Sequence, residues 1–297
     1  MCDEENYLML LRELDQNKTK ASRPDRTGTG TVAVFGRQLR FDISASVPLL
    51  TTKYINWKSV IEELLWFLKG DTDSNALVAK GVNIWKGNTS REFLDARGLV
   101  DYREGDCGPM YGFQWRHYGA EYEGCDACYA SKGIDQLDEV VRMLKEDPFS
   151  RRIMLTTYNV ADKEKGVLYP CHGVVVQFYC EEDVEGVRHL SCHMYQRSMD
   201  SFLGAPYNIF SYAVLTYILA LKTCMVPKEL IISTGDTHLY LDHIEQSKLQ
   251  TSRIPYDPPT LELNPVLKDM QWDEMQIDHF DVVGYRHYPY IKAKMSV

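Results

Sequence analysis

Residues 166–200 read GVLYPCHGVVVQFYCEEDVEGVRHLSCHMYQRSMD, and they contain the two segments that decide the fold. Residues 172–180 and 187–195 are rich in β-branched and aromatic side chains, and an acidic Gly-containing stretch at 181–186 separates them. Two such runs on either side of a turn predict a β-hairpin. The hairpin would place Cys171 at the mouth of its first strand and Arg197 near the end of its second.

Cys171 has two interpretations at this point. Free cysteines are among the most buried residue types, so a structural cysteine is one of them. A nucleophile is the other, because a nearby guanidinium such as that of Arg197 stabilises a thiolate. His172 is a poor partner for the thiol, since neighbours along a strand point to opposite faces. Pro170 restricts its own backbone and would hold the thiol in place.

Composition points to a globular protein without general affinity for nucleic acid. The 297 residues include 44% hydrophobic residues and no linker, repeat or low-complexity tract, so we expect one domain over residues 1–297. Forty-two acidic and 33 basic residues give a net charge of −9, which disfavours generic polyanion binding. Any anion site must therefore be a local cluster of arginines.

The cysteines indicate a reducing compartment, and the apolar segments indicate neither secretion nor a membrane span. We therefore expect the cytoplasm, with the nucleus or mitochondrion as alternatives. Eight cysteines over this length do not form a disulfide framework. Cys125 and Cys128 lack a second pair at zinc-site spacing, so we expect a solvated loop and no metal. The N-terminus does not resemble a signal peptide, and the longest apolar run, 212–221, is too short to span a bilayer.

Local patterns predict most of the other elements. Apolar periodicity favours helices over 5–16, 57–69, 134–145 and 209–223, and two short helices within 72–97. Strands are expected over 31–43 and 230–233, and a last strand near Val283. Residues 101–126 favour a packed loop, and residues 235–240 are expected to enter another helix. Asn208 precedes the helix over 209–223 and is a favoured N-cap residue.

The helix over 57–69 carries two adjacent glutamates with different expected surroundings. Lys58 and Lys69 lie within helical reach of Glu62, so Glu62 has ordinary surface partners. Glu63 has no basic helix neighbour and lies near Trp66. Its carboxyl is therefore expected to have a raised pKa, which suits general acid/base chemistry, with an exposed rim glutamate as the alternative.

Seven motifs occur in the order found in thymidylate synthases, and the chain resembles that family from about residue 20 to its end. They are DRTGTGT at 25–31, EELLWF at 62–67, YGFQWRH at 111–117, PCHxxxxQFY at 170–179, LSCxxYQRSxD at 190–200, LGxPYNIxSY at 203–212 and GDTHLY at 235–240. The resemblance implies an α+β fold with a large mixed β-sheet and surrounding helices. It also implies that one sheet face packs against a second copy in a homodimer, and that the last residues form a lid.

The resemblance further implies reductive methylation of dUMP to dTMP. The one-carbon unit and the hydride would both come from 5,10-methylenetetrahydrofolate, and dihydrofolate would be released. Cys171 would add to C6 of uracil, because a thiolate is suited to reversible addition. Asn208 and a water held by Glu63 would stabilise the resulting enolate at O4. Tyr111 would lie nearest the C5 proton, and Arg197 would stabilise the thiolate and bind phosphate.

Binding residues follow from the same resemblance. The implied dUMP contacts are Arg26, Arg151, Arg152, Gln196, Arg197, Ser198, Asp200, Asn208, His238 and Tyr240, with Arg151 and Arg152 reaching across the dimer interface. The implied folate contacts are Lys53, Ile84, Trp85, Asn88, Asp200, Leu203, Gly204, Tyr207 and Val297. No metal, membrane or nucleic acid is implied.

The chain departs from the family pattern without losing a catalytic group. Tyr169 replaces the first of two prolines before the cysteine; the other departures are Tyr54, Asn56, Lys86, Tyr158 and Tyr207. Two other functions remain open. A hydroxymethylase of the same fold, acting on dUMP or dCMP, would let water rather than hydride capture the exocyclic methylene, and a nucleotide-binding pseudoenzyme would do no chemistry.

Overall fold

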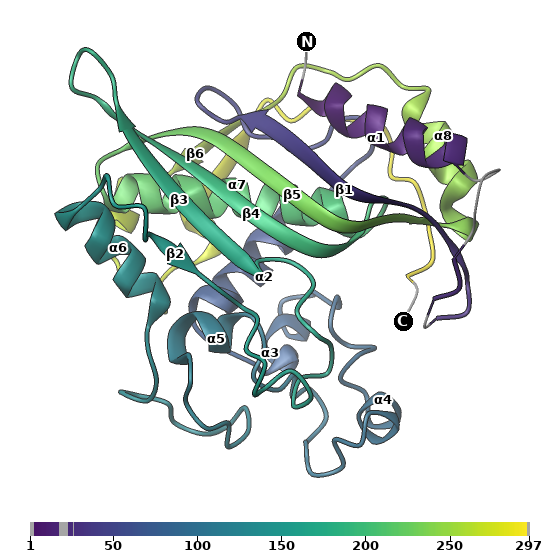
Figure 1. Ribbon diagram of the computed structural model, residues 1–297, viewed down its shortest axis with the longest axis horizontal. Helices are drawn as coiled ribbons and strands as arrows, with labels where there is room; N and C mark the ends of the chain where they lie inside the picture. Colours follow the sequence, from purple (N-terminus) through teal and green to yellow (C-terminus); the bar gives the residue numbers. More distant parts are fainter. Residues whose placement is uncertain (1–2, 18–22, 26, 296–297) are drawn as a thin grey trace.

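A mixed five-stranded sheet organises the protein (Figure 1). The computed structural model describes residues 3–17, 23–25 and 27–295. The strands lie in the order β1-β5-β4-β3-β2, and only β4 and β5 run parallel. Their bounds are β1 (Thr31–Asp42), β2 (Met154–Leu155), β3 (Val175–Glu182), β4 (Arg188–Asp200) and β5 (Val226–Tyr240). The α+β class is therefore confirmed.

The predicted hairpin is confirmed as β3 and β4. Its register pairs Val175 with Tyr195 and Glu182 with Arg188. The second strand continues to Asp200, beyond its predicted end, because it also pairs in parallel with β5. That parallel register places Asp200 opposite His238 and so gathers polar side chains at one end of the two strands.

Helices cover one face and the ends of the sheet. They are α1 (Glu4–Asn17), α2 (Trp57–Leu68), α3 (Ser74–Val78), α4 (Arg91–Ala96), α5 (Gly112–His117), α6 (Gln136–Glu146), α7 (Gly204–Lys222) and α8 (Ile244–Thr251). The short strands β6 (Thr260–Leu263) and β7 (Phe280–Val283) form a separate pair, and β7 is the predicted last strand. The helices predicted over 5–16, 57–69 and 134–145 are confirmed within two residues.

The helix α7 is the centre of the core. It packs on β4 and β5 and is apolar nearly all round, as predicted. Fully burying a side chain the size of Ile209 or Leu215 contributes about 1.5–3 kcal/mol. Within the described residues it is the one helix long and apolar enough to cross a membrane, but 72% of that stretch is buried inside the protein. This burial is the pattern of a core helix.

Three predictions of local structure are wrong. The helix α7 begins at Gly204 rather than at residue 209, because Pro206 is tolerated in a first helical turn. Asn208 is therefore inside the helix and is not its N-cap. Residues 235–240 belong to β5, since strands on both sides hold them extended. The predicted loop 101–126 contains α5, which is too short for its pattern to stand out.

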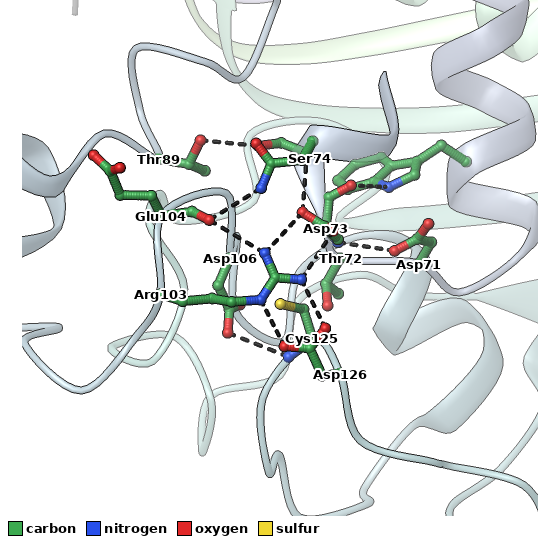
Figure 2. A network of polar contacts seen from close by, with 12 residues as sticks. Asp71, Thr72, Asp73, Ser74, Thr89, Arg103, Glu104, Asp106, Cys125 and Asp126 are labelled. Carbon is green, nitrogen blue, oxygen red and sulfur yellow. Dashed lines mark hydrogen bonds and ion pairs between the residues drawn. The ribbon is translucent and has the colours of Figure 1, made fainter. Parts of the chain in front are cut away.

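A polar network centred on Arg103 holds the loops that surround α3 and α4 (Figure 2). The Arg103 guanidinium forms ion pairs with Asp73 at 2.9 Å and Asp126 at 2.6 Å. On the same network, Ser74 Oγ lies 2.9 Å from Thr89 Oγ1, which donates to the Trp85 carbonyl at 3.0 Å. Because these contacts join distant loops, they fix the segment that carries Trp85.

The pair of cysteines at 125 and 128 lies at the edge of this network. The Cys125 amide donates to Asp106 Oδ2 at 3.2 Å, and the side chain of Cys128 is exposed. In the described part of the chain, no group of three or more His, Cys, Asp or Glu residues is placed to hold a metal ion.

Candidate active site

A cavity of about 760 Å³ opens where β4, β5, α2 and the first turns of α7 meet. This volume suits a small-molecule site of the common size range. Of the residues proposed from sequence, fifteen line it: Glu63, Ile84, Trp85, Asn88, Tyr111, Cys171, Arg197, Ser198, Asp200, Leu203, Gly204, Tyr207, Asn208, His238 and Tyr240. They come from segments far apart in the sequence, so the fold brings together the group that the motifs indicated.

Cys171 lies on the cavity wall, which favours the nucleophile over the structural cysteine. Its Sγ is 3.4 Å from the Tyr111 hydroxyl, and its amide donates to that hydroxyl at 3.0 Å. Burial raises the pKa of the Cys171 thiol, while the Tyr111 hydrogen bond and the Arg197 charge oppose the rise. Thiolate formation therefore depends on both neighbours.

Arg197 is fixed beside the cysteine by backbone groups. Its Nε donates to the Pro170 carbonyl at 2.9 Å, and one terminal nitrogen donates to the Tyr169 carbonyl at 2.9 Å. Its own amide donates to the Cys171 carbonyl at 2.9 Å. In the described part of the chain it pairs with no carboxylate, so its charge is available to a thiolate and to a bound anion.

His172 is not a partner of the thiol. Its ring stacks on Tyr111 with centroids 4.4 Å apart, and its Nδ1 lies 3.1 Å from the Tyr212 hydroxyl. Burial lowers the pKa of His172 to about 3, so the ring is neutral. It supports Tyr111, whose φ of 33° is uncommon for a residue other than glycine and marks a constrained position.

Glu63 has the raised pKa expected from the sequence. Burial raises the pKa of its carboxyl to about 7, although a hydrogen bond from Trp85 opposes the rise. A group that titrates near neutral pH suits proton transfer. The expectation for Glu62 is wrong, because Glu62 is buried and pairs at 2.6 Å with Lys80 rather than with Lys58 or Lys69.

Asn208 and His238 both line the cavity, but only His238 has a side-chain partner among the described residues. Among the described residues the Asn208 amide has no hydrogen-bond or ion-pair partner, which leaves its donor and acceptor free for a ligand. His238 Nδ1 lies 3.1 Å from Asp236 Oδ1, and this contact lowers the pKa of Asp236. Asp236 in turn holds Arg23 at 2.6 Å.

Four of the proposed residues are described but do not line the cavity. Gln196 is buried and donates to the Ser198 carbonyl at 3.2 Å. Lys53 is buried with its Nζ over the Phe202 ring, and burial lowers its pKa to about 7. Arg151 and Arg152 are exposed just before β2. Arg26 and Val297 lie outside the described residues.

Other lining residues were not proposed from the sequence. Asp236 was within a quoted motif, but nothing in the sequence singles out Arg97, which comes from the end of α4. Tyr290, Ala293 and Met295 also line the cavity. Nearby, His243 Nε2 lies 2.8 Å from the Lys294 carbonyl. The C-terminal segment, as far as it is described, is thus a packed wall of the site.

Comparisons with known proteins agree on one family. A family model described as thymidylate synthase matches residues 5–297. The chain is 48% identical over 301 residues to thymidylate synthase of Agaricus bisporus, with 100% of each chain covered. It is 44% identical over 295 residues to bifunctional dihydrofolate reductase-thymidylate synthase of Zea mays, covering 99% of this chain and 55% of that protein.

A third relative is the probable thymidylate synthase of Schizosaccharomyces pombe, at 48% identity over 300 residues, covering 99% of this chain and 48% of that protein. The chain therefore spans about half the length of the maize and fission-yeast relatives and the full length of the mushroom one. With the family model matched over nearly all of its length, the chain belongs to the thymidylate synthase family.

Proposed function

We propose that the protein methylates dUMP reductively to dTMP, with 5,10-methylenetetrahydrofolate as donor of both the carbon and the hydride and dihydrofolate as coproduct. The observation that carries the proposal is Cys171 on the cavity wall, with Tyr111 and Arg197 beside it. Glu63 and Asn208 line the same cavity and supply the proton and amide groups that the reaction needs. The chain would act as one catalytic domain in the cytoplasm and would need no metal.

The first chemical step uses Cys171 and Asn208. The thiolate forms a bond from Sγ to C6 of uracil, and the C5–C6 π electrons move to O4 as an enolate. The Asn208 amide donates to that oxygen, and Glu63 holds a water there. The enolate then makes C5 nucleophilic towards the one-carbon unit.

The later steps move a proton and expel the thiol. Tyr111 lies nearest the C5 proton, which leaves once the new carbon–carbon bond has formed. The bond between the one-carbon unit and the folate nitrogen would then break, which leaves an exocyclic methylene on C5 and tetrahydrofolate in the site. Hydride transfer from tetrahydrofolate to that methylene would give the methyl group and dihydrofolate, and the C5–C6 double bond would re-form as the Cys171 thiolate leaves. Trp85, Ile84, Leu203 and Tyr207 give this part of the cavity an apolar, aromatic wall that fits a flat bicyclic ring and excludes water. Release of Cys171 from C6 completes the cycle.

The phosphate of dUMP would be bound by a cluster of arginines. Arg197 and Ser198 line the cavity, and Arg26 precedes β1 in the sequence. Arg151 and Arg152 would come from the second copy of the chain in a homodimer, since they are exposed and do not line the cavity of their own chain. Charge-assisted bonds to a dianion are stronger than neutral ones. His238 and Tyr240 would meet the deoxyribose hydroxyl.

The open face of the sheet supports the homodimer. In Figure 1 the sheet is seen from the face opposite α7. Exposed side chains on that sheet include Phe35 at 83%, Tyr179 at 60%, Tyr195 at 38% and Val175 at 37%. Exposed apolar patches of this kind mark interaction sites.

One spectrophotometric assay tests the activity. Purified protein with dUMP and methylenetetrahydrofolate should form dihydrofolate and dTMP in equal amounts. A hydroxymethylase would instead release tetrahydrofolate, and a nucleotide-binding pseudoenzyme would release neither. Either of these results would overturn the proposed function.

A further inference from the structure

The two carbonyls that hold the Arg197 guanidinium belong to Tyr169 and Pro170, immediately before the cysteine. Where Arg197 lies therefore depends on where the backbone of residues 169 and 170 lies. This backbone is part of a connection without helix or strand between β2 and β3. Something outside the regular elements must hold it in place.

The side chain of Tyr169 is fixed at both ends. Its hydroxyl donates to Glu164 Oε2 at 2.5 Å. Its ring faces the guanidinium of Arg97, with 5.4 Å between the Arg97 Cζ and the ring centroid. A cation over an aromatic face at this distance is attractive, by about 0.5–1 kcal/mol at an exposed site and more where water is excluded.

Arg97 ties this contact to the rest of the protein. It is the C-cap residue of α4, and a terminal nitrogen donates to the Gly166 carbonyl at 3.4 Å. Its Nε is buried without a hydrogen-bond partner, and no ion pair with a carboxylate is found for it among the described residues. The guanidinium of Arg97 thus contacts the Tyr169 ring and the Gly166 carbonyl, and Arg97 and Tyr169 line the same cavity.

We propose that Tyr169 is a positioning residue for Cys171. Its contacts with Glu164 and Arg97 fix the connection over residues 164–170 against α4, and this keeps the carbonyls of residues 169 and 170 where they hold Arg197 beside the thiol. The role deepens the proposed function and rests on it for its catalytic meaning. The geometry it describes, from Tyr169 through Arg197 to Cys171, stands independently of the reaction.

The charges around the thiol set the expected direction. Burial raises the pKa of Cys171, the Tyr111 hydrogen bond and the Arg197 charge lower it, and the Glu63 carboxylate raises it. If the Tyr169 contacts are lost and Arg197 becomes less fixed, the thiol pKa should rise. The same change should weaken binding of the dUMP phosphate, because Arg197 serves both.

The test measures thiol reactivity rather than turnover. The rate of Cys171 alkylation by iodoacetamide is followed by peptide mass spectrometry from pH 6 to pH 10, in the absence of folate. For Tyr169→Ala we expect a rise of about 0.5–1 unit in the apparent pKa, and so an alkylation rate near neutral pH about three- to tenfold lower. Tyr169→Phe, which loses only the Glu164 bond, should lie between Tyr169→Ala and wild type.

Two further variants test the contact from the side of Arg97 and provide a control. Arg97→Met should move the alkylation profile in the same direction as Tyr169→Ala and raise the KM for dUMP. Arg142→Met is the matched control, because Arg142 pairs with Glu139 and Glu146 on the exposed surface of α6. It should leave the profile unchanged.

The outcomes separate the two proposals. If Tyr169→Phe, Tyr169→Ala and Arg97→Met lower the melting temperature but keep the wild-type alkylation profile, Tyr169 is merely structural and the positioning role is overturned. Should Tyr169→Ala not fold, Tyr169→Phe and Arg97→Met decide the question by the same criterion. A shifted profile in a protein that forms no dTMP would overturn the proposed function and support the positioning role.

Discussion

The indole Nε1 of Trp85 donates a hydrogen bond of 2.8 Å to Oε1 of Glu63, so one side chain that would wall the folate also limits the rise in the pKa of the proposed proton carrier. Burial raises the pKa of Glu63, and the indole bond partly opposes that rise. The position of the Trp85 indole therefore affects the protonation of Glu63. The backbone carbonyl of Trp85 in turn accepts from Thr89 Oγ1, and Thr89 contacts Ser74 of the network around Arg103.

We predict that Glu63→Gln removes a pH-dependent loss of stability. The folded-state pKa of Glu63 is raised from 4.5 to about 7. A carboxyl with a raised folded pKa stabilises the fold below pH 4.5, and that contribution is lost as the pH rises through 7. The wild type should thus lose up to about 3 kcal/mol relative to Glu63→Gln over this range.

Melting temperatures at pH 5 and pH 8 measure this effect. At pH 5 the two proteins should melt at similar temperatures, and at pH 8 the variant should melt higher by on the order of 5 °C. Glu62→Gln is the control, since Glu62 is paired with Lys80, and it should not become relatively more stable as the pH rises. A constant difference between wild type and Glu63→Gln at the two pH values would contradict the raised pKa.

We predict that Cys171 is the essential nucleophile. Cys171→Ala should abolish dTMP formation and leave dUMP binding largely intact, because the phosphate contacts remain. Incubation of the wild type with 5-fluoro-dUMP and methylenetetrahydrofolate should add the mass of both to the peptide that contains Cys171. Cys180 and Cys192 are buried in the sheet, and a label on either would contradict the assignment.

Shared sites are the third prediction. A Cys171→Ala chain and an Arg151→Glu chain should each be weak alone, but their heterodimer contains one site with an intact cysteine and an intact Arg151 from the other chain. Activity should therefore return after subunit exchange. Exchange is verified by mass spectrometry of differently tagged chains, and verified exchange without activity would mean that Arg151 does not act across the interface.

The fourth prediction concerns the base that Asn208 reads. Its amide can donate to uracil O4 and accept from N3–H, whereas cytosine presents the reverse pattern. Each buried mismatch costs roughly 1–3 kcal/mol. Asn208→Asp should therefore lose dUMP methylation and gain relative activity on dCMP, measured as the ratio of the two kcat/KM values. A ratio within about threefold of the wild type, only ~0.6 kcal/mol, would mean that the base is read elsewhere.

Local patterns predicted the elements whose apolar periodicity is complete within their own length. The helix α2, the strand β1 and the hairpin of β3 and β4 are of this kind. The early start of α7 was missed because its first turn lacks a polar cap, and amides just before it, those of Phe202 and Leu203, bond to Asp200 instead. The extension of β5 depends on two partner strands that local sequence does not contain.

The same distinction holds for the site. Residues within motifs, such as Cys171 and Glu63, could be predicted together with a chemical role. The burial of Lys53 outside the cavity could not be predicted, because its contact with Phe202 depends on packing between segments distant in the sequence. No motif contains Arg97, and the role proposed for it depends on its contact with the ring of Tyr169, which the sequence does not show. Tyr169 was visible as a departure from the family pattern, but its contacts were not.

The pairing of β1 with β5 has a consequence for biosynthesis. Thr31 pairs with Tyr240 and Asp42 with Glu229, so β1, which is synthesised early, cannot pair until β5 has been synthesised. Contacts so distant in sequence form slowly, and an unpaired strand edge is prone to aggregation while it waits. During synthesis on the ribosome, Cys171 and β4 are present before β5, the strand that carries His238. We therefore expect the candidate site to assemble only late in translation. Chaperones that bind the unfinished chain and prevent its aggregation should then raise the yield of folded protein.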